Sequence, residues 1–526
     1  MVSRNLPVDG AVVGAGPSAF YCAHRVLSRL PYSQVHLYDR LWAPHGLVRY
    51  GVAPDHPEVK NCTHKFDETA LDPRFKFFGN VSLSAPLPMK QNVSLPLSSL
   101  FPYYTHILLS HGASRPLPLE NMDPSHTITA LRFVHWYTGH PSTYHLPSPP
   151  LSKVKHITLV GHGNVSLDIA RLLLTDSSLL SSLDISAHVL EELHKSTVEH
   201  VNIVSRRGPA QVAFTAKELR ELLNLPNASM VPIIPEMFSP LTLVPASSSA
   251  VEITNNGPKS ATSIIPGLTR QQTRILDLLK KGSKMAFGST RKTFSFQFFR
   301  TPHSSSSSSG TITYDLNMLN PDGKARWTGD RETQNTDLVV PSLGYRSDPL
   351  VPSPTPIIPT PNGAETGVVD GWYDSTLGRV RNVSGRVHAF VPSSSPDQSH
   401  RLCRIKNVYA SGWAANGAKG VLASTMYDAY AVSDLLVSDH LSQQNELASE
   451  ESIAPSINLL EGDQDLGTNL ATGLPAFLNE ASKGAGKRVV SYPEWKMIDE
   501  EERRRGQQMG KEKERMSWEE VNIFLS

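Results

Sequence analysis

The chain has 526 residues, of which 39% are hydrophobic and 19% are charged, and its formal net charge is +1. This length exceeds what one hydrophobic core normally serves, so we expect two domains of unequal size. A balanced charge gives no reason to expect nucleic-acid binding, because phosphate binding needs a concentrated basic face. No apolar run approaches the roughly 18 residues of a membrane-spanning helix, so no transmembrane segment is expected.

The first pattern that indicates chemistry lies near the N-terminus. A short apolar run over residues 8–13 leads into the turn GAGPSA and then into a helical pattern. In such a turn Gly14 permits the tight bend, Gly16 lets the backbone approach a pyrophosphate, and Ala19 keeps the helix close to the strand. The succession of strand, glycine turn and helix is typical of a dinucleotide-binding fold.

An acidic residue defines the kind of nucleotide expected at this first turn. The strand over residues 35–38 ends at Asp39, and a carboxylate there can accept hydrogen bonds from an adenosine ribose. The same carboxylate would repel a 2′-phosphate. The first site is therefore expected to hold FAD or NAD and to reject NADP.

The pattern recurs later with the opposite charge. A strand over residues 156–160 leads into the turn GHGNVS and a helical pattern that has Asp168 and Arg171 on its polar side. The next strand, over residues 201–204, is followed by Arg206 and Arg207 instead of an acid. Two guanidinium groups suit a phosphate dianion, so this site is expected to prefer NADPH. A solvated pair of arginines is the alternative interpretation.

The residues between the two turns, GLVRYGVAPDHPEVK over positions 46–60, together with the first turn resemble the adrenodoxin reductase family of mitochondrial ferredoxin-NADP reductases. The second turn and the segments 206–221, 342–346, 411–413 and 420–422 resemble the same family, and residues 491–502 do so weakly. Glutamate-synthase-type reductases share part of this pattern but carry cysteine clusters. Here Cys22, Cys62 and Cys403 match no iron-sulfur, zinc or redox spacing, so we expect no metal centre.

The resemblance implies an α/β fold of two Rossmann-like dinucleotide-binding domains, with the NADP domain inserted into the FAD domain. The FAD domain is expected over residues 1–115 and 346–526, the latter with a C-terminal extension, and the NADP domain over residues 116–345. Serine and proline gather at 147–150, 304–309 and 352–361, which we interpret as surface loops or linkers. The serine run 304–309 is expected to be a disordered loop of the inserted domain.

The resemblance also implies both cofactor sites. Expected FAD contacts come from Gly14, Gly16, Pro17, Ser18, Asp39, Leu47, Val81, Trp413, Gly420, Val421 and Leu422. Expected NADP contacts come from His162, Gly163, Asn164, Val165, Arg206, Arg207, Glu218 and Gly420. Trp413 is expected to cover the flavin, with plain core packing as the alternative. His162 stands where glutamine is usual in the family, and residues 414–416 replace a more basic stretch, which leaves details of nicotinamide placement open.

The activity implied by the resemblance is NADPH-dependent reduction of a ferredoxin. NADPH delivers a hydride to FAD, and FAD passes single electrons to a 2Fe-2S protein, so no protein nucleophile is required. His56 is the candidate catalytic residue beside the reacting rings, although a loop-fixing hydrogen bond is an equal alternative. The ferredoxin is expected to be acidic and to bind Arg220, Arg270 and Arg274, for which an ordinary solvated helix face is the alternative.

Other expectations follow from the family alone. Its members usually carry a presequence, whereas here the first predicted strand begins within about ten residues of Met1. The resemblance implies a monomer on the matrix side of the mitochondrion, peripheral to the inner membrane. Two other functions stay open. The protein could be a flavoprotein that reduces quinones, dyes or oxygen directly, or a nucleotide-binding scaffold without catalysis. A flavin monooxygenase is disfavoured because its second-site motif is missing.

Overall fold

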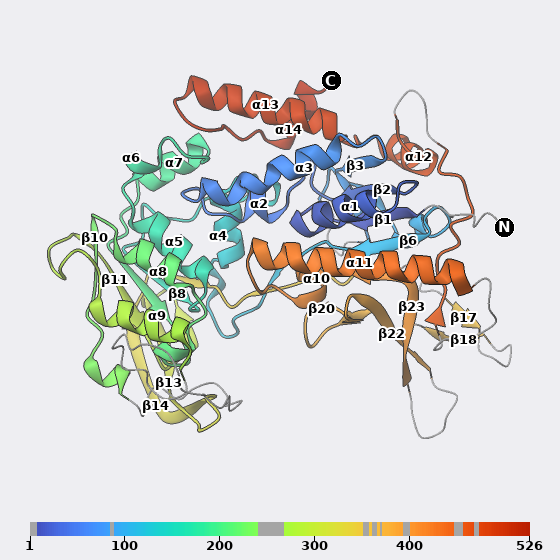
Figure 1. Ribbon diagram of the computed structural model, residues 1–526. Helices are drawn as coiled ribbons and strands as arrows, with labels where there is room; N and C mark the ends of the chain where they lie inside the picture. The colour runs from blue at the N-terminus through green and yellow to red at the C-terminus, as the bar shows by residue number, and fades with distance from the viewer. Residues whose placement is uncertain are drawn as a thin grey trace, which may run out of the picture.

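The computed structural model describes residues 8–84, 89–239, 268–350, 357–359, 365–368, 371–392, 400–446, 456–467 and 473–526. Two lobes lie side by side, each built around a sheet of largely parallel strands (Figure 1). The strands of the second sheet lie between those of the first along the chain, so the expected α/β fold with one unit inserted into the other is confirmed. Most of the proline-rich stretch 352–361 lies outside the described residues.

The first unit forms around the N-terminal strand. Neighbouring strands from β3 to β23 run parallel, and β22 and β21 add an antiparallel edge. Helices α1 and α11 pack against each other, as Figure 1 shows, and α3 contacts α1. The sheet order is β21 (Asn382–Val383), β22 (Arg386–Pro392), β23 (His400–Ala410), β6 (His106–Leu109), β1 (Asp9–Val13), β2 (Gln34–Asp39) and β3 (Phe75–Gly79), and β24 (Ser456–Ile457) pairs with β23. The helices are α1 (Pro17–Arg29), α2 (Leu47–Tyr50), α3 (Thr63–Ala70), α10 (Trp413–Asn416) and α11 (Leu422–Glu446).

The second unit repeats this plan with a fully parallel sheet. Its strands are rich in buried valine, isoleucine, leucine and phenylalanine, as expected for a parallel sheet that is covered on both faces. The order is β10 (Ala228–Met230), β11 (Lys292–Gln297), β9 (His200–Val204), β8 (His156–Val160) and β15 (Leu338–Pro341). The helices are α4 (Ala130–Tyr137), α5 (Asn164–Leu174), α6 (Ser177–Leu180), α7 (Ala187–His194), α8 (Ala216–Leu223) and α9 (Arg270–Lys281).

Short ribbons join and complete the two units. Strand β7 (Arg115–Pro116) pairs antiparallel with β16 (Tyr345–Arg346), so the chain leaves the first unit and returns to it at one place. The other pairs are β4 (Val81–Leu83) with β5 (Val93–Leu95), β17 (Ile357–Pro359) with β18 (Glu365–Val368), and β19 (Tyr373–Asp374) with β20 (Arg379–Val380).

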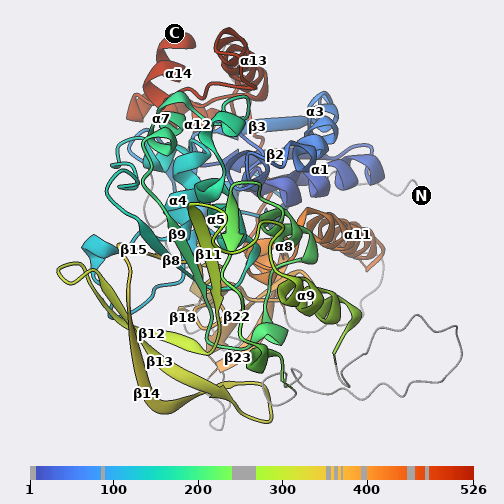
Figure 2. The ribbon, with the colours of Figure 1, turned by 90° about the vertical axis from the view of Figure 1, so that its left-hand side faces the viewer.

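The serine run 304–309 is not a disordered loop, and that prediction was wrong. Residues through Ser306 belong to β12 (Arg300–Ser306), which pairs with β13 (Thr311–Leu319), and β14 (Ala325–Asn335) extends this antiparallel sheet (Figure 2). The turn is fixed by Asp123, whose Oδ2 accepts hydrogen bonds from the backbone N–H of Ser307 at 3.0 Å and from its hydroxyl at 2.6 Å. Composition alone could not reveal this, because Asp123 lies far away in sequence.

The C-terminal segment packs across the boundary between the units. It contains α12 (Ala476–Ala485), α13 (Tyr492–Gln508) and α14 (Trp518–Phe524), and α13 and α14 lie at the top of Figure 1 above that boundary. Helix α13 begins with a capping box in which the side chains of Ser491 and Glu494 each accept a hydrogen bond from the other residue's backbone. Among the helices that the structure describes, none combines the length and the apolar content that crossing a bilayer requires.

Candidate functional site

The first glycine turn is shaped to receive an anion. Gly14 has φ of +107°, and a Cβ there would lie 2.5 Å from the carbonyl oxygen of Ser110, so only glycine fits. A Cβ on Gly16 would meet no protein atom within 4 Å, which means that the backbone faces open space. Helix α1 starts directly afterwards at Pro17, and its unbonded amide groups face the same end. The turn therefore fits the pyrophosphate of a dinucleotide.

Asp39 lies beside this turn, at the end of β2. Its carboxylate accepts hydrogen bonds from the backbone N–H of Ala15 at 2.6 Å and of Leu41 at 2.8 Å. Burial raises the pKa of Asp39, and these two hydrogen bonds act against that rise. A carboxylate offers about four lone-pair sites, so acceptor capacity for ribose hydroxyls remains.

A shallow hollow that is open to solvent lies at the same place. Val81 of β4, which is buried, forms part of its wall. A second acid closes one side, since Asp348 accepts hydrogen bonds from Arg40 at 3.1 Å and from Ser114 at 2.5 Å. The lining residues are Val13, Gly14, Tyr38, Asp39, Arg40, Val81, Ser82, Leu83, His111, Asp348 and Leu350.

Distant segments meet around the first turn. Gly46 passes so close that a Cβ on it would lie 3.0 Å from the Cα of Gly16, and Leu47 follows as the first residue of α2. From the other end of the chain, the Ser411 hydroxyl lies 2.7 Å from the hydroxyl of buried Ser18. The structure thus brings Leu47 and the segment from Ser411 onward to the turn that contains Gly14 and Gly16.

Trp413 and the start of α11 lie beyond Ser411. The Trp413 indole N–H donates a hydrogen bond of 3.1 Å to the Lys419 carbonyl, and the indole stacks on Tyr345 with ring centroids 6.3 Å apart. Trp413 is only half-buried, which does not fit plain core packing. Gly420 has φ of +85°, Val421 is 55% exposed, and Leu422 begins α11. These residues present a surface that a ligand can cover.

The second glycine turn is built in the same way. Gly161 has φ of +130°, and a Cβ there would collide with the carbonyl of Ser342, whereas a Cβ on Gly163 would meet no atom within 4 Å. Helix α5 starts at Asn164, whose side-chain oxygen accepts a hydrogen bond of 2.9 Å from the backbone N–H of Thr215. Val165 follows, partly buried against the core. This turn also leaves its backbone open toward an anion.

The side chain of His162 points away from that opening. Its Nε2 lies 2.9 Å from the backbone oxygen of Ile203, and aromatic rings surround it. Burial lowers the pKa of His162 to about 4, so the ring is neutral and donates to that carbonyl. Any cofactor contact of His162 must come from its backbone. The surrounding rings belong to Phe214, Phe296 and Phe298.

Two arginines follow β9 without an acidic partner. Arg206 is exposed and Arg207 is half-buried, and within the described part of the chain no carboxylate lies at ion-pair distance from either guanidinium. Burial and the charge of Arg206 lower the pKa of Arg207. Two neighbouring positive charges without compensation favour a bound anion.

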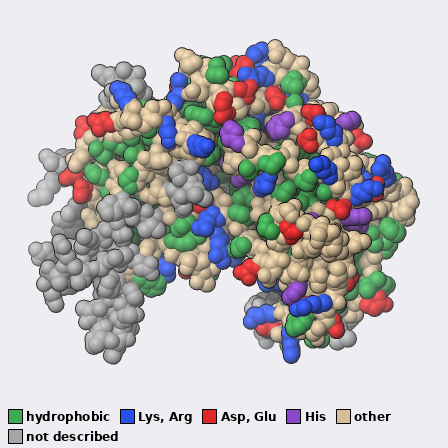
Figure 3. All heavy atoms as spheres, turned by 180° about the vertical axis from the view of Figure 1, so that it is seen from behind, with side chains coloured by type: hydrophobic (Ala, Val, Ile, Leu, Met, Phe, Trp, Pro, Cys, Tyr) green, Lys and Arg blue, Asp and Glu red, His purple; other side chains and the backbone are tan. Residues whose placement is uncertain are grey.

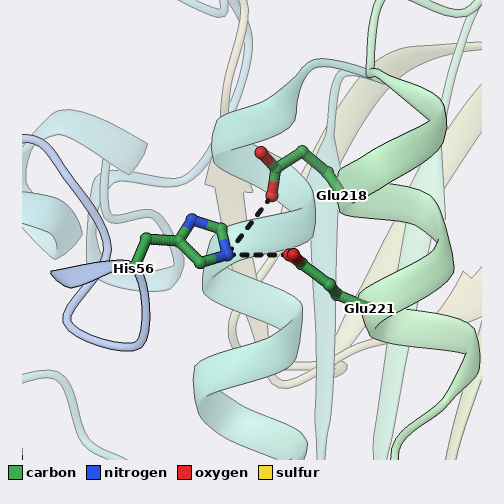
Figure 4. Close-up of side chains that lie close together, drawn as sticks. All are labelled: His56, Glu218 and Glu221. Atoms are coloured by element: carbon green, nitrogen blue, oxygen red, sulfur yellow. Dashed lines mark hydrogen bonds and ion pairs between the residues drawn. The ribbon is translucent and has the colours of Figure 1, made fainter. Parts of the chain in front are cut away.

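His56 lies at the boundary between the units, opposite two glutamates of α8 (Figure 4). Its Nε2 is 2.7 Å from Oε2 of Glu221 and 3.7 Å from Oε2 of Glu218. Burial, reinforced by the nearby charge of Asp168, raises the pKa of Glu218 to about 7. The arrangement can hold and exchange a proton near neutral pH. Glu221 was missed from the sequence.

Arg171 joins this group from α5. Its guanidinium donates to Asp55 Oδ1 at 3.0 Å and to Asp168 at 2.9 Å, and Nη1 lies 3.4 Å from Glu218 and 3.6 Å from Glu221. Arg171 is buried, so the polar side of this helix faces the other unit and not solvent. His56, Glu218 and Glu221 have metal-ligand spacing, but Arg171 already supplies positive charge to both glutamates, and we assign no metal there.

The predicted partner residues share one part of the second unit. Arg270 and Arg274 are both exposed on α9, four residues apart, and α9 packs against α8, which contains Arg220. In the described ranges none of the three forms an ion pair. On the face shown in Figure 3, which is the back of the view in Figure 1, Lys and Arg side chains are interspersed with Asp and Glu side chains.

Known proteins resemble this chain over nearly its whole length. No family model matches the chain. The chain is 32% identical over 508 residues to the NADPH:adrenodoxin oxidoreductase, mitochondrial, of Drosophila melanogaster, which covers 96% of this chain and 90% of that protein. This chain belongs to the NADPH:adrenodoxin oxidoreductase family. The human relative is 32% identical with 96% and 89% covered, and the Arabidopsis thaliana relative is 30% identical with 99% and 97% covered.

A solved structure agrees with the family. Mycobacterium tuberculosis FprA in complex with NADPH superposes on the chain with a TM-score of 0.75 and 28% sequence identity. The match covers 99% of this chain and 100% of that one. The chain therefore shares the fold of FprA over nearly its whole length.

Proposed function

We propose that the chain is an FAD-dependent NADPH:ferredoxin reductase. The observation that supports this most directly is the opposite charge beside two similar turns, an acid at the first and, at the second, two arginines that form no ion pair among the described residues. The acid favours FAD over a 2′-phosphorylated nucleotide, and the arginines favour NADPH. The relatives' names and the NADPH complex of FprA point the same way.

The first site fits FAD. The open backbone at Gly16 would receive the pyrophosphate, Asp39 the ribose, and Leu47, Trp413 and the residues from Gly420 to Leu422 would border the flavin. When bound, FAD accepts a hydride and releases single electrons to an iron-sulfur acceptor. The protein's own part is to hold the two nucleotides in register and to exclude water.

At the meeting point of the units, His56 would lie beside the reacting rings and hold a proton together with Glu218 and Glu221. Arg171 keeps both glutamates in place through its buried guanidinium. Glu218 is also proposed to contact NADPH, as are Gly163, Asn164, Val165 and the backbone of His162.

The electron acceptor is proposed to be an acidic 2Fe-2S ferredoxin. The exposed Arg270 and Arg274, with Arg220 on the adjoining helix, supply the positive surface that would steer an acidic partner into a short-lived encounter. Such encounters weaken as salt is added, so the salt dependence of the rate tests this proposal directly.

The setting of the enzyme is also a proposal. Relatives are named as mitochondrial proteins, which supports a mitochondrial location. We further propose the matrix side, a peripheral position at the inner membrane and a monomer. The division into residues 1–115, 116–345 and 346–526 belongs with these proposals, and the β7–β16 ribbon supports it.

One assay tests the function. Cytochrome c reduction is measured with NADPH and with NADH, with and without an added 2Fe-2S ferredoxin. We expect a strong NADPH preference and dependence on ferredoxin. Equal use of NADH and NADPH would remove the assignment of Arg206 and Arg207. Turnover independent of ferredoxin would instead support direct reduction of quinones or other small acceptors, and a purified protein that NADPH does not bleach would support the scaffold.

A further inference from the structure

A buried acid of the second unit is held by cations of the first. Asp184, in the segment between α6 and α7, is only 4% exposed. Its Oδ2 accepts a hydrogen bond of 2.8 Å from Lys60, and its Oδ1 accepts one of 3.0 Å from Arg515. Lys60 follows the His56 loop, and Arg515 lies near the C-terminus. These cations hold the pKa of Asp184 far below its usual range despite burial, so the carboxylate is charged.

Through Glu502, Arg515 connects this ion pair to α2, which lies beside the first glycine turn. Its Nη1 lies 3.8 Å from Glu502 of α13, which is fully buried. Glu502 in turn accepts hydrogen bonds of 2.8 and 2.9 Å from Arg49 of α2. Arg49 is two residues after Leu47, so a chain of alternating buried charges links the loop beside the first turn to Asp184 of the second unit.

The segment that contains Arg515 makes further contacts with the second unit. We call residues 509–517, between α13 and α14, the C-terminal strap. Lys511 donates a hydrogen bond of 2.8 Å to the Ile185 carbonyl, and the backbone N–H of Glu512 donates one of 3.1 Å to the Ser182 carbonyl. Tyr144 of the second unit donates one of 2.9 Å to the Met516 carbonyl. The strap is thus attached to two separate stretches of that unit.

We propose that Asp184 and Arg515 are positioning residues that fix the second unit relative to the first, so that the two nucleotides meet at reacting distance. The proposal rests on the proposed function. A buried ion pair with good geometry resists separation, because breaking it leaves an uncompensated charge in the interior. Hydride transfer is sensitive to small errors of position, and misplacement by about 1 Å can lower a rate about 100-fold. Neither residue touches either nucleotide turn, so their effect must come through the angle between the units.

The test uses the FAD-loaded full chain and Asp184→Asn. Anaerobic mixing with NADPH gives the rate of flavin bleaching, and steady-state ferricyanide reduction gives kcat and KM for NADPH. We expect bleaching and kcat to fall at least about tenfold, with KM within about twofold, because Arg206 and Arg207 still hold the 2′-phosphate. The control is Glu191→Gln on α7, which removes an exposed partner of Lys195 and should change neither. The double variant Asp184→Asn/Arg515→Gln should be no slower than the slower single variant, because the two residues act through each other.

The outcomes separate the two proposals. If the unmutated protein is not bleached by NADPH, the proposed function falls and this inference falls with it. If the unmutated protein is bleached and Asp184→Asn is bleached within about twofold of its rate, only the inference falls. Should Asp184→Asn fail to retain FAD, Arg515→Lys decides instead, because it keeps a positive charge near Asp184 but removes the two guanidinium hydrogen bonds to that carboxylate. A bleaching rate of Arg515→Lys within about twofold of wild type would then overturn the inference.

Discussion

The carboxylate of Glu218 lies 3.7 Å from Nε2 of His56, across the boundary between the two units. Burial raises the pKa of Glu218 to about 7, so the folded protein keeps a proton that the unfolded chain releases near pH 4.5. Between these values the folded state binds more protons than the unfolded state. The contribution of Glu218 to stability is therefore present below pH 4.5 and is lost as the pH rises toward 7.

Glu218→Gln should remove this pH dependence. Only 14% of the Glu218 side chain is exposed, so solvent screens its charge little. Between pH 4 and pH 8 we expect the free energy of unfolding of the variant to rise by about 1–3 kcal/mol relative to that of wild type. The measurement is the difference in Tm between wild type and variant across this range, without nucleotide. Glu192→Gln on α7 is the control for the loss of a carboxylate elsewhere in the same unit. A flat difference for Glu218→Gln would contradict its raised pKa.

Arg207→Ala should weaken the choice of NADPH over NADH. Removing one charged donor from a phosphate costs about 1.5–3 kcal/mol, so KM for NADPH should rise roughly 10- to 100-fold while KM for NADH stays nearly constant. Steady-state kinetics with both nucleotides check this, and FAD content should not change. The matched control is Arg291→Ala, an exposed arginine of the same unit that pairs with Glu199. Unchanged selectivity would mean that Arg207 does not meet the 2′-phosphate.

Features that depend on neighbouring residues could be predicted from the sequence, whereas contacts between residues far apart in the chain could not. The strand over residues 156–160 was predicted with the bounds that the structure has, because strand periodicity and glycine turns are local signals. The contact of Arg171 with Asp55 joins residues 116 positions apart, and no local pattern indicates it. The same reason explains why Glu221 beside His56 and the strap residue Arg515 were missed. Aromatic packing around His162 likewise appears only once β9 and β11 are paired.

Asp39→Asn should weaken the retention of FAD. The Asp39 carboxylate accepts from two backbone N–H groups, and an amide would place a donor against one of them and remove the charge. Because charge-assisted hydrogen bonds contribute about 1.5–3 kcal/mol, we expect FAD affinity to fall roughly 10- to 100-fold. Release of flavin fluorescence on dilution measures this. Asp322→Asn, in the exposed turn between β13 and β14, serves as the control. Equal retention by Asp39→Asn and wild type would show that this acid does not support the ribose.

Reversing the charge of Arg270 and Arg274 should impair only the partner step. Both arginines are exposed on α9, which belongs to neither glycine turn. The double variant Arg270→Glu/Arg274→Glu should therefore bind FAD and be bleached by NADPH like wild type. With an acidic 2Fe-2S ferredoxin as acceptor, cytochrome c reduction should show a KM for ferredoxin raised at least about tenfold, because like charges replace opposite ones in the encounter. Added salt should lower the wild-type rate and leave the variant nearly unaffected or faster, since screening removes attraction in one and repulsion in the other. The double reversal Lys76→Glu/Lys90→Glu, at two exposed positions of the first unit, changes the net charge by the same amount and should keep the wild-type salt dependence. If both variants behave alike, the ferredoxin docks elsewhere than on α9.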